Sequence, residues 1–186
     1  FVSEKVMDKP QLAFVIPSYN EELCIKNTAE KLLLVIDDLV LKGKIREDSF
    51  LYFVDDGSVD NTWNLIQELH SSDNRIKGLK FLRNYGNQKA LIAGLEGVRD
   101  LGVDCSISID ADLQQDEWAA ERFIDEYQKG FDIVSGIRND RKTDSFLKKI
   151  TAQAFYKTMN ILGVRLTMNN SDYRLVSRRA LEVLKE

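Results

Sequence analysis

Two aspartates one residue apart, Asp110 and Asp112, are the first candidates for chemistry in this sequence. They lie at the end of an apolar run at residues 105–109, and residues two apart in an extended segment point to the same side. Their carboxylates could hold one Mg²⁺ or Mn²⁺ ion whose remaining ligands are water and diphosphate oxygens. Such an ion would stabilise the charge that builds up on a departing nucleoside diphosphate. The alternative is that Asp112 only caps a helix, because so short a pattern is common.

A second acidic pair, Asp55 and Asp56, follows the apolar run at residues 50–54. Adjacent carboxylates at a strand end cost free energy unless hydrogen-bond donors or a cation offset their repulsion. One or both could accept hydrogen bonds from a base imide or a ribose hydroxyl. Gly57 permits a tight turn here, and Asp60 is placed to cap the next helix.

A third polar group follows the apolar run at residues 12–16, where Pro17 is expected to end the strand. Tyr19 could stack on a nucleotide base, and Glu21 adds a carboxylate. The alternative is that Asn20 and the glutamates form a helix start while Tyr19 packs on the sheet.

Three arginines, Arg138, Arg141 and Arg174, could bind a phosphate through charge-assisted hydrogen bonds. Each could equally form a surface ion pair. Asp172, two residues before Arg174, would be the general base for a hydroxyl acceptor, or would orient Arg174 or a donor hydroxyl if the acceptor is a phosphate.

The elements that must position these residues alternate along the chain. Apolar runs predict strands at residues 12–16, 50–54, 76–82, 105–109 and 132–135. Helices are expected at residues 22–41, 61–69, 88–98 and 116–128, and a longer one at 145–162. This alternation predicts an α/β fold with a mostly parallel sheet and helices on both faces. Ligands of such sheets bind beyond the carboxyl ends of the strands, where all three polar groups are expected.

Length and composition set broad limits. The 186 residues suit a single domain, and the net charge of −4 argues against a nucleic-acid partner. Cys24 and Cys105 have no metal-ligand or redox spacing and are expected to be reduced thiols. Because the chain starts at Phe1 and stops in a helical-looking segment, we expect it to be a piece of a longer protein.

Taken together, the motifs V-I-P-S-Y-N-E-E (15–22), V-D-D-G-S-V-D-N-T (54–62) and D-A-D-L-Q (110–114) resemble those of the GT-A glycosyltransferases known as family 2. The resemblance implies a Rossmann-like GT-A domain over residues 1–186. It implies nucleotide-sugar contacts from Pro17, Tyr19, Glu21, Asp55, Asp56 and Asp110. It also implies metal and diphosphate binding by Asp110, Asp112 and Gln114, and makes Asp112, Asp172 and Arg174 the catalytic candidates.

Further segments look like the polyprenyl-phosphate branch of this family, the dolichol-phosphate mannose synthases and undecaprenyl-phosphate glucosyltransferases. They are R-N-Y-G-N-Q (83–88), G-I-R (136–138) and S-D-Y-R-L (171–175). The sequence departs from the pattern of this branch at two places. Gln115-Asp116-Glu117 replaces a proline-containing run, and Asn87 stands where histidine is common.

The implied reaction is inverting transfer of a hexose from a UDP-glucose-like donor to a polyprenyl phosphate at the cytoplasmic membrane face. Transmembrane helices would then follow this piece, and the helix at 145–162 could rest on an anionic membrane surface. A lipid phosphate is largely ionised near neutral pH, because its second pKa is about 6, so it needs cations such as the three arginines rather than a base. The alternatives are a soluble family member that extends a polysaccharide or glycolipid head group, and a non-catalytic nucleotide-binding regulator. The oligomeric state stays open.

Overall fold

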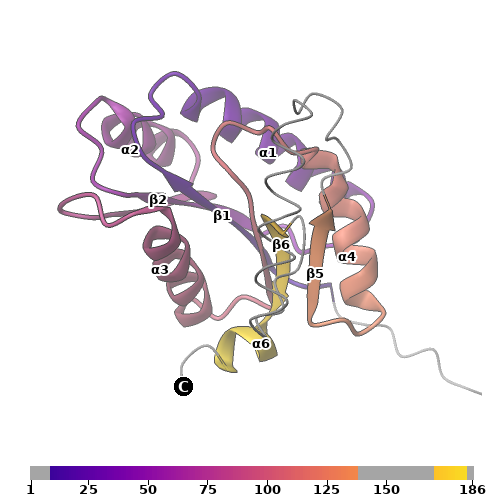
Figure 1. Ribbon diagram of the computed structural model, residues 1–186. Helices are drawn as coiled ribbons and strands as arrows, with labels where there is room; N and C mark the ends of the chain where they lie inside the picture. The colour runs from indigo at the N-terminus through magenta and orange to yellow at the C-terminus, as the bar shows by residue number, and fades with distance from the viewer. Residues whose placement is uncertain (1–8, 138–169, 184–186) are drawn as a thin grey trace, which may run out of the picture.

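The computed structural model describes residues 9–137 and 170–183 (Figure 1). Its strands are β1 (Leu12–Ser18), β2 (Phe50–Asp55), β3 (Ile76–Lys80), β4 (Cys105–Ser108), β5 (Ile133–Ile137) and β6 (Asn170–Ser177). Its helices are α1 (Ile25–Leu41), α2 (Thr62–Ser72), α3 (Asn87–Asp100), α4 (Ala120–Gln128) and α6 (Arg178–Val183), with a 3-10 turn, η1 (Glu117–Ala119), before α4. The helix expected at 145–162 lies outside the described residues. No helix in the described ranges has both the length and the apolar character needed to cross a bilayer.

The six strands form one sheet in the order β3-β2-β1-β4-β6-β5. Strands β1 to β4 are parallel, whereas β6 runs antiparallel to both of its neighbours, β4 and β5. From β1 the chain moves outward to β2 and β3, and then crosses to the other side of β1 to form β4. The carboxyl ends of β1 and β4 therefore flank the topological switch point, where open α/β sheets bind their ligands.

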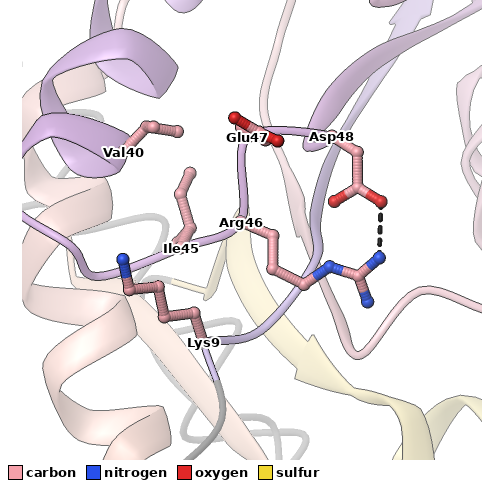
Figure 2. Close-up of a pocket in the computed structure, with 6 residues that line it drawn as sticks. All are labelled: Lys9, Val40, Ile45, Arg46, Glu47 and Asp48. Carbon is pink, nitrogen blue, oxygen red and sulfur yellow. Dashed lines mark hydrogen bonds and ion pairs between the residues drawn. The ribbon is translucent and has the colours of Figure 1, made fainter.

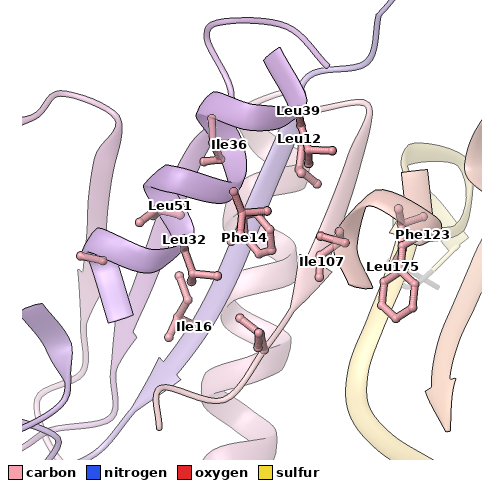
Figure 3. Packing of buried hydrophobic residues seen from close by; sticks show 14 of the residues in the cluster. Leu12, Phe14, Ile16, Leu32, Ile36, Leu39, Leu51, Ile107, Phe123 and Leu175 are labelled. Atoms are coloured by element: carbon pink, nitrogen blue, oxygen red, sulfur yellow. The ribbon is translucent and has the colours of Figure 1, made fainter. Parts of the chain in front are cut away.

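Alternate residues of β1 face two different layers of helices. Leu12, Phe14 and Ile16 point into a core built with α1, α2 and α4 (Figure 3). Ala13 and Val15 point into a second core with α3 and α6. The expected α/β architecture with helices on both faces is confirmed, and Figure 1 shows the two layers on opposite sides of the sheet.

Strand β1 continues through Pro17, which was expected to end it. The Ser18 carbonyl accepts a hydrogen bond from the Asp56 N–H at 2.9 Å, on the β2 side. Because successive residues of a strand bond to opposite sides, Pro17 is directed to the β4 side, where the ladder stops at Val15 and Ser108. The missing N–H of proline therefore costs no ladder bond.

Two further elements differ from expectation. Strand β6 was not predicted, because it alternates polar residues with the buried Tyr173 and Leu175 instead of forming an apolar run. The helix expected at 116–128 is divided into η1 and α4, and the Asp116 side chain caps η1 by accepting from the Trp118 N–H at 3.1 Å.

Candidate active site

The loops that follow β1 and β2 are joined to each other by hydrogen bonds between residues 38 to 41 positions apart. These bonds are Asn20 N to Ser58 Oγ (2.9 Å), Val59 N to Asn20 Oδ1 (3.0 Å), Glu21 N to Thr62 Oγ1 (2.8 Å), Glu22 N to Asp60 Oδ2 (3.2 Å) and Asn61 N to Glu22 Oε2 (2.9 Å). Asp60, which precedes the N-cap residue Asn61, also accepts from the Thr62 N–H at the start of α2, at 3.0 Å. Most polar residues of the first two motifs therefore brace the loops, which leaves few of them free for a ligand.

Asp56 is buried and is committed to the loop that follows β3. Its two carboxylate oxygens accept the backbone N–H groups of Tyr85 and Gly86 at 2.7 and 2.8 Å. Gly57 lets this loop approach closely: its φ is +69°, and a Cβ there would lie 2.3 Å from the Arg83 carbonyl carbon. Asp56 and Gly57 thus seat residues 83–86 against the end of β2.

Asp55 is fully buried but only half satisfied. Its Oδ1 accepts the Ser58 N–H at 3.1 Å, whereas its Oδ2 has no hydrogen-bond partner in the described part of the chain. An unsatisfied buried carboxylate oxygen is costly unless a ligand supplies the donor. Asp55 pairs with Ser18 across the ladder, so this oxygen lies beside the end of β1. Next to it Pro17 is buried, and Tyr19 is 43% exposed.

The segment after β4 is held by helix α1. Thr28, buried in α1, donates a hydrogen bond from its hydroxyl to the Ala111 carbonyl at 2.5 Å. Leu113 then adopts a φ of +48°, which turns the chain. The residue between the two aspartates is thereby fixed to the protein core, and Asp112 does not cap a helix, because that position belongs to Asp116.

The two carboxylates of this segment have different partners. Asp112 is exposed, and its oxygens accept the Gln114 backbone N–H at 3.3 Å and the Gln114 side-chain amide at 2.8 Å. Asp110 is half-buried, and its Oδ2 accepts from the Gln115 side-chain amide. Within the described residues no hydrogen bond reaches Asp110 Oδ1.

The carboxyl of Glu21, after β1, lies within the electrostatic reach of acidic groups that follow β2 and β4. Burial raises the pKa of this carboxyl, a hydrogen bond with Cys24 opposes this shift, and the nearby charges of Asp112, Asp60 and Asp110 raise the pKa further. The motifs after β1, β2 and β4 therefore contribute to one negative field at the switch point, and such a field attracts a cation.

The residues expected to bind the acceptor are only partly described. Arg138 and Arg141 lie outside the described residues, as does the side chain of Asp172, although its backbone lies in β6. Arg174 pairs with Ser108 of β4 and Ser135 of β5. With Gln88 and Ser108 it lines a cavity of about 250 Å³ between α3 and the sheet.

A second cavity, of about 380 Å³, lies at the opposite end of the sheet (Figure 2). Lys9 and Arg46 line it just before β1 and β2 begin, and Arg46 is paired with Asp48 at 2.5 Å. It is remote from every motif of the three strand ends.

This arrangement can be compared with known proteins. The model of the family described as glycosyl transferase family 2 matches residues 13–185. The chain belongs to glycosyl transferase family 2. The resemblance seen in the three motifs is thereby confirmed.

Relatives within family 2 match nearly all of this chain. The uncharacterized glycosyltransferase YkoT of Bacillus subtilis (strain 168) is 46% identical over 177 residues, which are 95% of this chain and 52% of YkoT. The bactoprenol glucosyl transferase of Shigella phage SfX is 36% identical over 183 residues, 94% of this chain and 55% of that protein. The chain thus spans about half the length of the curated relatives it matches.

A solved structure supports the fold. The glucosyl-3-phosphoglycerate synthase of Mycobacterium tuberculosis, in complex with Mn²⁺, UDP and glucosyl-3-phosphoglycerate, aligns with a TM-score of 0.57 and 20% identity. The alignment covers 91% of this chain and 57% of the synthase.

The family 2 site fits a divalent cation with a sparse protein shell. Among the described residues no three His, Cys, Asp or Glu side chains are grouped to hold a metal. Mg²⁺ and Mn²⁺ need only one or two carboxylates when substrate phosphates complete the shell. Asp110, with one oxygen that takes no hydrogen bond from the described residues, and the exposed Asp112 can supply those carboxylates.

Sequence reasoning gave no role to two residues that this family 2 site uses. Thr28 fixes Ala111, and Gln115 contacts Asp110. Thr28 lies on a predicted helix far from the motif, so nothing local pointed to it. Gln115 carried a signal, since it begins the run that departs from the family pattern.

Proposed function

We propose that this family 2 domain transfers a glucosyl residue, with inversion, from a UDP-glucose-like donor to a polyprenyl phosphate. Two observations carry the proposal: Glu21 lies within the electrostatic reach of Asp112 and Asp110 at the switch point, and a buried Asp55 oxygen at the end of β2 has no donor among the described residues. The relatives named bactoprenol glucosyl transferase, such as that of Shigella phage SfX, support the sugar and the lipid acceptor, because bactoprenol is a polyprenyl alcohol.

The nucleoside would lie over the ends of β1 and β2. Asp55 Oδ2 would accept the imide N–H of the base or a ribose hydroxyl, since it is a buried carboxylate oxygen for which the described part of the chain offers no donor. Tyr19 would offer its exposed ring for stacking, and the buried Pro17 precedes it by two residues at the end of β1. Asp56 would act indirectly by holding the loop at 83–86.

The diphosphate would lie beside the segment after β4, where Asp110, Asp112 and Gln114 would hold Mg²⁺ or Mn²⁺. Once bound, this ion offsets the charge that accumulates on the departing UDP. Thr28 keeps the segment in place through Ala111, so the two carboxylates need little reorganisation during the reaction.

In the transfer, an oxygen of the lipid phosphate attacks the anomeric carbon as the bond from that carbon to the β-phosphate oxygen breaks. The nucleophile is already an anion near neutral pH, because its second pKa is about 6, so no proton has to be removed. Arg174, with Arg138 and Arg141, would bind the phosphate, and Asp172 would orient Arg174 or a donor hydroxyl. Since the acceptor is a lipid, the reaction takes place at a membrane surface; we assign it to the cytoplasmic face, with transmembrane helices in the remainder of the longer protein.

The test is transfer of labelled glucose from UDP-glucose to undecaprenyl phosphate by the full-length protein, with Mn²⁺ or Mg²⁺. We expect activity that chelators abolish and that Asp112→Ala reduces at least 100-fold. Asp48→Ala, which removes an exposed carboxylate at the opposite end of the sheet, is the matched control and should keep full activity. Full activity of Asp112→Ala would refute the metal assignment. Transfer to a free saccharide that is lost in Asp172→Asn would support the polysaccharide-extending alternative, and metal-dependent UDP binding without turnover on any acceptor would support the regulator.

A further inference from the structure

Gln115 is a buried amide that touches the first aspartate of the D-A-D segment. It is 9% exposed, and its Nε2 donates a hydrogen bond to Asp110 Oδ2. Its other polar atom, Oε1, is buried and has no hydrogen-bond partner in the described part of the chain.

The orientation of this amide follows from the chemistry of its partner. An ionised carboxylate only accepts hydrogen bonds, so the NH₂ group of Gln115 must face Asp110. A flipped amide would bring two acceptors together. The contact with Asp110 therefore leaves Oε1 without a partner, which lowers stability. A methionine would fill the same space with no orphan oxygen, so folding alone does not explain a glutamine at this position.

The backbone beside Gln115 is held from the sheet. The Tyr173 hydroxyl of β6 donates to the carbonyl of Asp116, the next residue, at 3.1 Å. Tyr173 is buried and its ring lies 4.7 Å from that of Phe123, centre to centre. Asp116 in turn caps η1. Gln115 thus extends toward Asp110 from a fixed support.

We propose that Gln115 is a positioning residue: it holds Asp110 Oδ2 so that Oδ1 faces the crevice between β1 and β4 and is available to the divalent cation. The inference rests on the metal site of the proposed function. The partner of a ligating carboxylate fixes its rotamer before the ion arrives, and removal of such a partner commonly weakens metal binding about 10- to 100-fold.

The experiment compares Gln115→Met with the parent protein, using the full-length chain. The dissociation constant of Mn²⁺ in the presence of UDP is measured by electron paramagnetic resonance, and stability by urea denaturation. We expect the Mn²⁺ dissociation constant to rise about 10-fold or more, with stability unchanged or increased and UDP affinity without metal unchanged. Gln128→Met is the matched control, since Gln128 bonds the Lys44 carbonyl far from the site, and it should leave Mn²⁺ binding unchanged.

A rescue variant separates positioning from packing. Gln115→His places an imidazole N–H at a similar reach from the backbone, so it should recover most of the Mn²⁺ affinity above the ordinary histidine pKa. Unchanged Mn²⁺ binding in Gln115→Met would overturn the proposal, as would weaker binding that only follows a loss of stability. Because no acceptor enters this assay, a protein that binds Mn²⁺ and UDP but transfers no sugar would contradict the proposed function and leave the role of Gln115 intact.

Discussion

The adjacent residues Asp55 and Asp56 should respond in opposite ways to the same change, aspartate to asparagine. Asp56 uses both oxygens to accept backbone N–H groups. An asparagine there can accept on one side only, and its NH₂ group would face an N–H donor on the other. Asp55 uses one oxygen, which asparagine retains, while its second oxygen has no partner among the described residues.

The magnitudes follow from these partners. A hydrogen bond to a charged group contributes about 1.5–3 kcal/mol, so Asp56→Asn should lower the free energy of unfolding by about 2–4 kcal/mol. For a chain of this size that corresponds to a melting temperature lower by roughly 5–15 °C. Asp55→Asn should leave stability unchanged or raise it, because a fully buried charge is removed. Its UDP affinity should fall about 10- to 150-fold through loss of one charge-assisted hydrogen bond.

The assay is urea denaturation of both variants together with UDP calorimetry. Asp56→Asn should be measured well below its own melting temperature, so that unfolding does not mimic weak binding. If Asp55→Asn destabilises the protein as much as Asp56→Asn, then removal of the buried Asp55 charge does not have the neutral or stabilising effect argued above. If Asp55→Asn binds UDP as the parent does, Asp55 is not a nucleoside contact.

Three further outcomes are expected. Gly57→Ala should lower the free energy of unfolding by at least about 2 kcal/mol, since left-handed backbone costs a side chain about 1–2 kcal/mol and the new Cβ meets the Arg83 backbone. Gly130→Ala, at a φ of +98° with open space, is the control and should cost less on urea denaturation. Thr28→Val should cost about 1–3 kcal/mol by leaving the Ala111 carbonyl unsatisfied, and should weaken Mn²⁺ binding in the presence of UDP; unchanged binding would show that α1 does not position the metal segment. Because the folded-state pKa of Glu21 is raised, its contribution to stability is present below its ordinary pKa of 4.5 and is lost as the pH rises through the raised value. The free energy of unfolding of the parent relative to Glu21→Gln should therefore decrease with rising pH over that range. A difference in free energy of unfolding that does not change with pH would contradict the raised pKa of Glu21.

The sequence predicted most of the fold because three strands, β1, β2 and β4, are buried on both faces and appear as apolar runs. Strand β6 was missed for the opposite reason: the buried Tyr173 and Leu175 are separated by Arg174 and preceded by polar residues, and an antiparallel strand added from far along the chain has no local signal. Pro17 was misread because its effect depends on which side of β1 still has a paired neighbour.

For the site, the sequence identified the three strand ends. It could not show which of their residues hold the loops in place and which are available to a ligand. Asn20, Ser58 and Thr62 bond across about 40 positions, and such bonds are invisible before the loops are placed. The same holds for the distinction between Asp55 and Asp56. Arg138, Arg141 and the side chain of Asp172 stay predictions.

The pairing of Ile137 with Asn170 has a consequence for how such proteins diversify. Partners in an antiparallel ladder lie about 5 Å apart, so the sheet itself clamps both ends of the stretch at 138–169. Each doubling in length of a stretch closed in this way adds only about 0.6 kcal/mol of chain entropy. Because the proposed function assigns acceptor contacts to Arg138 and Arg141 in this stretch, the sequence and length of the stretch could change to suit a different acceptor at little cost to the pairing of β5 with β6.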